Sequence, residues 1–258
     1  MMRMLKLGNR TLLRLALYAL PSVCIVDGFL VEPDWIRTRK INLGGTGPTH
    51  RLVHFTDLHY RGDRAMLRGL VDKINALDPD FVCFTGDIVE EKAHLKEALA
   101  LLRGIRSPLF GVPGNHDYWS GAPFEEIERS FAATGGAWLV DQAVASPDGK
   151  IIIVGASSHN TGFIKKEPTG KRLLLTHYPA FADLLKGKTF DLILAGHSHG
   201  GQLRIPLWGA VAVPWGTGRY EMGLYQTGAG PLYVNPGIGT FYMPIRVFCR
   251  PEVTVIQF

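Results

Sequence analysis

Short hydrophobic runs recur along the chain from residue 51 onward, and each run ends at a polar or glycine-rich turn. Continuous apolar runs bounded by turns are typical of strands that are buried on both faces of an α/β sheet. We therefore expect strands at 51–56, 80–85, 109–112 and 191–195. A further strand is expected in the run RLLLT, which ends just before His177. An alternating pattern predicts one further strand, with one polar face, over 35–43.

Two stretches between those runs, 65–77 and 95–105, repeat their apolar positions with the spacing of an α-helix. No internal repeat or low-complexity segment interrupts the chain after residue 33. Its 258 residues, of which 46% are hydrophobic and 20% charged, are ordinary for a globular protein. They suit one α/β domain and exclude disorder as the class.

Side chains that can bind metals follow these runs at the points where the strands end. Open α/β sheets build their sites at the chain ends of strands, so we expect these side chains to meet at one edge of one sheet. They are Asp57 and His59 in TDLH, Asp87 in TGDIV, Asn115 and His116 in PGNHD, His177 in LLTHYP, and His197 with His199 in GHSHG.

The histidine pair in AGHSHGGQ lies in a glycine-rich turn directly after an apolar run. In a regular strand His197 and His199 would point to opposite faces, but the glycines allow a turn that aims both rings at one point. Each segment also has a simpler interpretation when taken alone. Asp87 could cap a helix, Asn115 could serve a turn, and His177 could be a core histidine. Taken together, the segments favour a metal centre.

Carboxylate oxygens and neutral imidazole nitrogens suit Mn²⁺, Fe or Zn²⁺. The candidate ligands exceed the needs of one ion, so two divalent metal ions are predicted, with Asp87 as the carboxylate that bridges them. The ligand types do not choose among these metals. A pair of such cations serves the hydrolysis of phosphoesters.

The segments DLH, GD, GNHD, THYP and GHSHGGQ resemble, in order and spacing, the motifs of the calcineurin-like metallophosphoesterase superfamily. The resemblance covers residues 51–202. It implies a four-layer α/β/β/α sandwich with a two-metal site at the strand ends. It also implies that one metal is bound by Asp57, His59, Asp87 and His199, and the other by Asp87, Asn115, His177 and His197.

The same resemblance implies that His116 acts on the substrate without binding a metal. In the superfamily this position stabilises the transition state or protonates the leaving oxygen, and an acid often orients it. That acid corresponds to Glu90, which is one methylene longer than the usual aspartate, so its reach is open. Where Pro236 lies, relatives commonly carry arginine. Two expectations stay open: the phosphate contact of that arginine is missing, or Arg61 or Arg246 supplies it.

Residues 202–258 resemble the membrane-associated bacterial branch that includes phosphodiesterases and UDP-2,3-diacylglucosamine pyrophosphatases of lipid A synthesis. This resemblance implies an enzyme that hydrolyses a phosphodiester or pyrophosphate bond, with a lipid-linked substrate such as UDP-2,3-diacylglucosamine. The resemblance alone favours Mn²⁺, with Fe and Zn²⁺ left open. A phosphodiesterase that acts on soluble nucleotides is the alternative. A non-catalytic membrane scaffold is disfavoured, because no predicted ligand is missing.

The first thirty residues differ in composition from the rest of the chain. Arg3, Lys6, Arg10 and Arg14 precede the apolar stretch 15–31, which resembles a signal peptide or an anchor. No A-x-A cleavage site follows it, so we expect residues 1–32 to be an uncleaved anchor of the cell inner membrane, either spanning it or lying in its interface. A soluble amphipathic helix is the alternative. Basic residues on both flanks leave the orientation open. The phosphoesterase domain is predicted to span 33–258.

The net charge limits the classes of binding partner, and the cysteines limit the kinds of disulfide and zinc site that the chain can form. The net charge of +5 suits anionic headgroups or a phosphorylated substrate, but no Lys/Arg block indicates nucleic acid, and no protein partner is implied. The three cysteines lie far apart and predict neither a disulfide framework nor a CxxC zinc site. An apolar groove for acyl chains, a bilayer contact or a sheet core could account for the aromatic-rich loops of 208–243.

Overall fold

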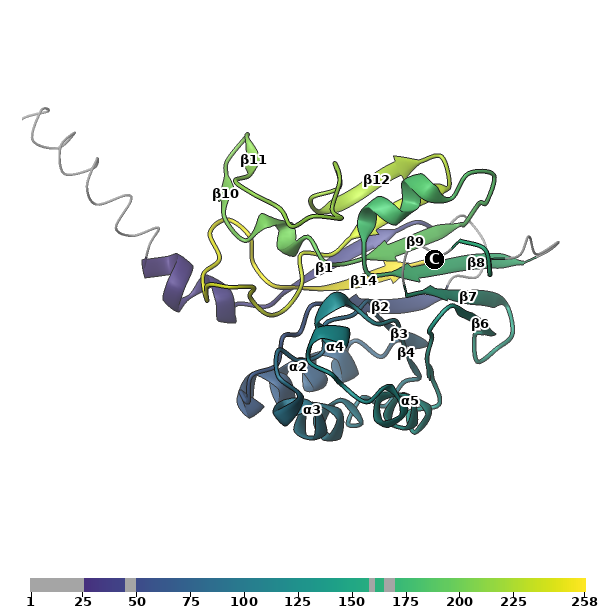
Figure 1. Cartoon of the computed structure of the whole chain (residues 1–258), viewed down its shortest axis with the longest axis horizontal. Coiled ribbons are helices and arrows are strands. Elements are labelled where there is room, and N and C mark those ends of the chain that lie inside the picture. Colours follow the sequence, from purple (N-terminus) through teal and green to yellow (C-terminus); the bar gives the residue numbers. More distant parts are fainter. Residues whose placement is uncertain (1–25, 45–49, 158–160, 165–169) are drawn as a thin grey trace, which may run out of the picture.

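The structure is a computed structural model that describes residues 26–44, 50–157, 161–164 and 170–258. Two six-stranded sheets pack face to face, and helices cover the outer face of the first sheet (Figure 1). This arrangement confirms the predicted α/β fold. The outer face of the second sheet carries a 3-10 helix and loops, so the fourth layer is thin over the described residues.

The first sheet has the strand order β1-β14-β2-β3-β4-β5. All neighbouring strands are parallel except β14 and β2, which run antiparallel. The bounds are β1 Arg37–Asn42, β14 Glu252–Gln257, β2 Arg51–Phe55, β3 Phe81–Phe84, β4 Leu109–Gly111 and β5 Ala137–Trp138. Its helices are α2 Arg64–Ala76, α3 Leu95–Leu102, α4 Asn115–Trp119 and α5 Phe124–Ala132, together with the 3-10 turns η1 Glu32–Asp34 and η2 Lys92–His94.

The second sheet has the order β12-β13-β9-β8-β7-β6, in which the central strands β13, β9, β8 and β7 are parallel. Its strands are β12 Gly223–Thr227, β13 Gly230–Val234, β9 Leu192–Ala195, β8 Lys171–Thr176, β7 Ile151–Ala156 and β6 Gln142–Ala145. A separate short hairpin is formed by β10 Arg204–Ile205 and β11 Gly209–Ala210. The remaining 3-10 turns are η3 Pro179–Leu184 and η4 His199–Gly201.

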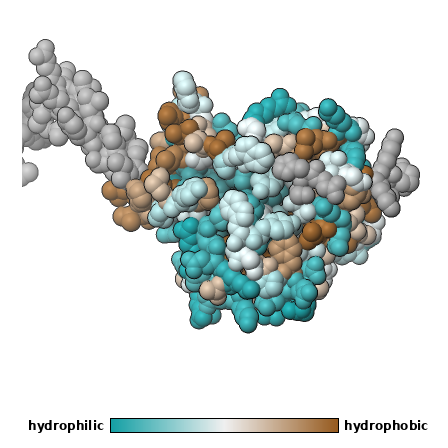
Figure 2. Space-filling model, viewed as in Figure 1, coloured by the Kyte–Doolittle hydropathy of each residue, from teal (hydrophilic) through white to brown (hydrophobic). Residues whose placement is uncertain are grey.

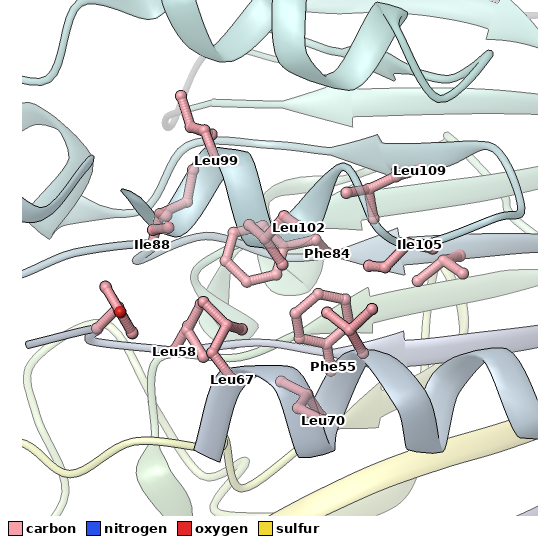
Figure 3. Packing of buried hydrophobic residues seen from close by; sticks show 14 of the residues in the cluster. Phe55, Leu58, Leu67, Leu70, Phe84, Ile88, Leu99, Leu102, Ile105 and Leu109 are labelled. Carbon is pink, nitrogen blue, oxygen red and sulfur yellow. The ribbon is translucent and has the colours of Figure 1, made fainter. Parts of the chain in front are cut away.

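Three hydrophobic clusters hold the layers together. The first lies between the helices and the first sheet, where Phe55 and Phe84 meet Leu67 of α2 and Leu102 of α3 (Figure 3). The second fills the space between the two sheets, and the third lies under η3. The solvent-facing side of the helical layer is largely hydrophilic (Figure 2). Burial on one face and hydration on the other explain the helical periodicity of the sequence.

The N-terminal boundary of the domain is closely tied to the C-terminal loops. Residues 26–30 are helical, and the carbonyl of Gly28 accepts a hydrogen bond of 2.9 Å from the amide of Arg246. The buried Glu32 carboxylate accepts one of 2.8 Å from the amide of Phe248. Residues 1–25, which carry most of the predicted anchor, lie outside the described residues. Within the described ranges, no helix combines the length and hydropathy that a bilayer crossing requires.

Candidate metal centre

Carboxylate, amide and imidazole groups from both sheets meet between the sheet edges. The expectation that they share one sheet is wrong, because β8 and β9 belong to the second sheet, which packs against the first. The first sheet supplies the segments after β2, β3 and β4, and the second supplies those after β8 and β9. All the predicted metal-binding side chains are buried: Asp57, His59, Asp87, Asn115, His177, His197 and His199.

The backbone at these positions is strained. Left-handed conformations, which non-glycine residues seldom adopt, occur at several of the candidate ligands. The φ angles are 51° at Asp57, 44° at His59, 65° at Asp87, 67° at His197 and 50° at His199. These turns aim side chains that a regular strand would send to opposite faces, as expected for the histidine pair.

One group of ligand atoms surrounds the Nε2 atoms of two histidines. Nε2 of His59 and Nε2 of His199 are 3.0 Å apart. Asp57 Oδ1 lies 3.4 Å from the His199 nitrogen, and Asp87 Oδ2 lies 3.5 Å from the His59 nitrogen. This geometry brings together the four side chains assigned to one metal.

A second group lies on the other side of Asp87. Oδ2 of Asp87 is 3.3 Å from Nε2 of His177. The same nitrogen is 3.0 Å from Oδ1 of Asn115 and 3.0 Å from Nδ1 of His197. Asp87 therefore contacts both groups, as a bridging carboxylate must.

The hydrogen bonds of the second group test whether a cation fits there. Nδ1 of His177 lies 2.7 Å from the carbonyl oxygen of Thr85, and Nε2 of His197 lies 2.6 Å from that of Trp215. A carbonyl oxygen only accepts, so each of these nitrogens carries its ring's proton. In the neutral rings, the opposite nitrogens then direct lone pairs at each other across 3.0 Å. A proton or a metal cation must lie between them.

The electrostatics favour positive charge at two of the four candidate histidine ligands, whereas burial lowers the pKa of His197 to about 4 and that of His199 to about 3. Burial lowers the pKa of His177, but the carboxylate of Asp87 outweighs this effect and raises the pKa to about 9. Burial likewise opposes protonation of His59, while Asp57, Glu90 and Asp87 raise its pKa to about 10. Metals compete with protons for such nitrogens. The buried His/Asp groups are consistent with a dinuclear metal site.

Asp117 holds the bridging segment in place, a role that the sequence reasoning did not assign although it quoted the GNHD motif. Its carboxylate accepts hydrogen bonds from the amides of Asp87, Ile88 and Gly114 at 2.8–2.9 Å. Asp87 Oδ1 in turn accepts one of 2.8 Å from the amide of His116. Burial and the nearby Asp87 charge raise the pKa of Asp117 to about 6.

Glu90 reaches the residue that the resemblance pairs with it. Its Oε2 lies 3.0 Å from Nδ1 of His116, and its Oε1 lies 2.7 Å from Nδ1 of His59. Its extra methylene therefore does not prevent the contact. Arg61 lies 3.3 Å from the same carboxylate and is about half exposed.

The Nη atoms of Arg246 are bound to the backbone, and its Nε is buried without a hydrogen-bond partner among the described residues. The side chain is fully buried, and its Nη atoms donate to the carbonyl oxygens of Cys249, Pro236 and Gly239. This geometry argues against the expected phosphate contact, because the donors are used to hold the C-terminal loops together. The side chain of Arg61 is about half exposed, and its guanidinium pairs with Glu90 near the site.

A cavity of about 470 Å³ opens beside the ligand cluster. Its wall contains His116 and several ligands, and the rest is aromatic or apolar: Trp119, Tyr178, Pro214, Trp215, Phe241 and Tyr242. The aromatic residues of these loops have two kinds of environment. Tyr220 is buried in the core, while Trp215 and Tyr242 are more than 80% exposed at this cavity. If a phosphoryl group were bound at the ligand cluster, the rest of the substrate would contact the aromatic and apolar walls of the cavity.

Comparisons with known proteins agree with this geometry. The sequence model of the family described as calcineurin-like phosphoesterase matches residues 50–201. An uncharacterized metallophosphoesterase from Bacillus subtilis, YkuE, is 31% identical over 249 residues, which cover 87% of this chain and 86% of the relative. The phosphodiesterase YaeI from Escherichia coli is 31% identical over 246 residues, which cover 88% of this chain and 89% of the relative.

Solved structures share the fold. The protein TT1561 of Thermus thermophilus superimposes with a TM-score of 0.52 at 12% identity, covering 74% of this chain and 91% of that protein. A dimetal phosphatase from Danio rerio has a TM-score of 0.52 at 11% identity, covering 82% of this chain and all of that protein. At such identities the likeness concerns the fold alone.

Proposed function

Because this chain belongs to the calcineurin-like phosphoesterase family and is a metal-dependent phosphoesterase, we propose that it hydrolyses a phosphodiester or pyrophosphate bond in a lipid-linked substrate. The observation that carries the proposal is the pairing of a buried ligand cluster with an aromatic cavity of about 470 Å³. The ligands suit a phosphoryl group, and the aromatic walls suit an apolar substituent on it. The name of the Escherichia coli relative, a phosphodiesterase, supports the bond type.

The ligand set would hold two divalent cations, for which we propose Mn²⁺, with Fe and Zn²⁺ as the other candidates. When bound, such a pair of ions supplies an activated water and neutralises phosphoryl oxygens. Asp57, His59 and His199 would hold one ion and Asn115, His177 and His197 the other, and Asp87, which lies near nitrogens of both groups, would serve both.

His116 has the position of a proton donor. Glu90 holds its Nδ1, and the ring lines the cavity, so Nε2 is the atom left for the substrate. We assign to it the protonation of the leaving oxygen. Arg61, whose side chain is about half exposed and whose guanidinium pairs with Glu90, is the proposed phosphate contact on the surface side.

Association with the cell inner membrane is part of the proposal. Its support lies in the sequence, where four basic residues precede the apolar stretch 15–31. The helical residues 26–30 keep Val26, Phe29 and Leu30 exposed, which continues that apolar character into the described part of the chain. An anchor of this kind would keep the enzyme beside a lipid substrate.

A soluble nucleotide diester is the second candidate substrate. The specific observation in its favour is the row of planar side chains at the cavity, where Trp119, Phe241 and Tyr242 could stack against a base. A lipid chain and a base place different demands on these rings, because only the base needs a face-to-face contact.

A turnover screen with Mn²⁺ separates the candidates. UDP-2,3-diacylglucosamine in detergent, the same compound without acyl chains, a cyclic or linear nucleotide diester and bis(p-nitrophenyl) phosphate are compared by kcat/KM. Preference for the acylated compound supports the proposal, and preference for the nucleotide diester supports the second candidate. No turnover of any diester or pyrophosphate, with monoesters hydrolysed instead, would overturn the proposed bond type.

A further inference from the structure

An exposed apolar surface surrounds the β10–β11 hairpin and the helical residues 26–30. Leu207 at the tip of the hairpin is fully exposed, and its neighbour Trp208 is 83% exposed. Figure 2 shows hydrophobic side chains gathered at the end of the molecule that carries this hairpin in Figure 1. We call this the hairpin surface, and it comprises Val26, Phe29, Leu30, Ile205, Leu207, Trp208, Val211 and Phe248.

The parts of the hairpin surface are joined by main-chain hydrogen bonds through residues 246–248. The amide of Arg204 donates to the carbonyl of Val247 at 3.0 Å, which attaches the hairpin to this segment. The amide of Arg246 donates to the carbonyl of Gly28, which attaches the helical residues 26–30. Phe248 lines one hollow together with Leu207 and Trp208. The apolar side chains therefore form one surface rather than scattered points.

The hairpin is held firmly although its tip contacts water. The guanidinium of Arg204 donates to the carbonyl of Gly200 at 2.7 Å and pairs with Glu221 at 3.0 Å. Glu221 also accepts a hydrogen bond from the amide of Ala210. These contacts fix the direction in which the tip projects.

Leu207 has no evident role in folding. Its φ angle of 69° is strained for a leucine, and turn positions of this kind favour glycine or asparagine. Its side chain is fully exposed, so no packing contact offsets the backbone strain. An apolar side chain held in this way is explained by a surface that covers it.

The hairpin surface leads to the mouth of the cavity. The chain leaves β11 at Ala210, and the exposed side chains of Val211 and Val213 follow it to Pro214 and Trp215 in the cavity wall. The carbonyl of Trp215 accepts the hydrogen bond that orients His197. The hairpin is therefore connected to the cavity wall through residues 211–213.

We propose that the hairpin surface inserts into the lipid bilayer and turns the cavity entrance toward it, an inference that rests on the proposed membrane association. The bilayer is the occupant indicated by the chain itself. Residues 1–25 join the molecule at this surface, carry four basic and no acidic residues, and end in an apolar run that resumes at Phe29 and Leu30 after Asp27 and Gly28. Exposed tryptophan beside apolar side chains suits the lipid interface.

Fluorescence of the full-length protein tests the insertion. The protein is added to vesicles of phosphatidylcholine and phosphatidylglycerol, with and without brominated acyl chains, and sedimentation measures binding. The difference between wild type and Trp208→Phe isolates the emission of Trp208. We expect brominated lipids to quench that emission roughly twofold or more, because the indole would lie among the upper acyl chains.

Leu207→Glu places a charge at the tip and should abolish the quenching of Trp208. Leu224→Glu is the matched control, because Leu224 is also exposed but lies on β12, outside the hairpin surface. It should leave the quenching unchanged. Both variants should hydrolyse bis(p-nitrophenyl) phosphate at the wild-type rate, which verifies that they are folded.

Each contrary result has a distinct meaning. Protein that sediments with vesicles while Trp208 stays unquenched would overturn the insertion and leave membrane association standing. Protein that does not sediment would overturn the proposed membrane association itself and the insertion with it. Protection of Trp208 from iodide before lipid is added would place residues 1–25 or a second copy on the surface, and this too would overturn the insertion.

Discussion

The Nδ1 atom of His116 lies 3.0 Å from Oε2 of Glu90, while the other oxygen of that carboxylate lies 2.7 Å from Nδ1 of His59. One carboxylate thus orients a ring assigned to the substrate and a ring assigned to a metal. The two imidazoles are nearly perpendicular, with centroids 4.7 Å apart, and the ring of His116 also meets Trp119. His116 therefore lies directly beside His59, and its contact with Glu90 is the geometry on which the proposed acid role rests.

His116→Asn should therefore separate chemistry from metal binding. Metal content should stay at the wild-type level, while kcat falls by about 10² to 10⁴, the usual contribution of a positioned proton donor. The loss should be larger for esters with poor leaving groups than for p-nitrophenyl esters, whose leaving oxygen needs little protonation. Elemental analysis and kcat for the two kinds of ester check this. Loss of metal, or an equal loss of rate for both, would remove the acid role.

Asp87→Asn should lower metal content and turnover together. Asp87 Oδ2 lies within 3.5 Å of nitrogens from both ligand groups, so the substitution removes charge from the shared position. Its Oδ1 also accepts from the amide of His116, which an asparagine oxygen can still do. Elemental analysis of the purified variant measures the metal. Asp72→Asn, on the exposed face of α2, is the control. Two equivalents of metal retained by Asp87→Asn would contradict the bridging role.

The sequence predicted β1 to β4, β8 and β9 and the residues at their ends, because buried runs and the turns after them are local features. It did not predict β5 to β7 or β10 to β14. The helix expected over 95–105 ends at Leu102, and Gly104 follows it. The division into two sheets was not visible in local patterns, since the apolar runs that form β2 and β9 look alike. That division became predictable only through the resemblance to a known family.

The sequence did not predict the roles of residues whose partners lie far away along the chain. Asp117 binds amides that precede it by about thirty residues, and Glu32 binds amides more than two hundred residues away. Arg246 looked available for a phosphate, yet it is buried among carbonyl groups of the C-terminal loops. Residue type and spacing indicate chemistry at strand ends, but burial decides whether a charged group meets a ligand or the backbone.

Gly196→Ala should damage the metal centre through a single methyl group. A Cβ at this position would lie 2.1 Å from Oγ1 of the buried Thr56 and 2.5 Å from Oδ2 of Asp57, so one of them must move. We expect a loss of about 1–3 kcal/mol in the free energy of unfolding, together with weaker metal binding.

Gly69→Ala is the matched control, because its Cβ would meet nothing within 4 Å on an exposed face of α2. It should raise the free energy of unfolding by roughly 0.5–1 kcal/mol. Denaturant titration and metal analysis measure both variants. Equal effects of the two substitutions would contradict the steric argument.

His54 should make the fold sensitive to mild acid. It is fully buried, and its Nε2 lies 2.9 Å from Oγ1 of Thr85. Burial lowers its pKa from 6.5 to about 3, against a smaller opposing effect of Asp57. Between these values the unfolded chain binds a proton that the folded chain does not, so stability falls as the pH drops from about 6.5 toward 3.

A His54→Gln variant tests this linkage, since glutamine can contact Thr85 but does not titrate. From pH 7 to pH 5, the metal-free wild type should lose about 2 kcal/mol more free energy of unfolding than the variant, because one protonation contributes ~1.4 kcal/mol per pH unit. Denaturant unfolding at both pH values, with chelator present, gives the difference. Other groups that titrate in both proteins cancel in this comparison. Equal losses in the two proteins would mean that His54 takes up its proton without unfolding, which a histidine sealed in this core should not do.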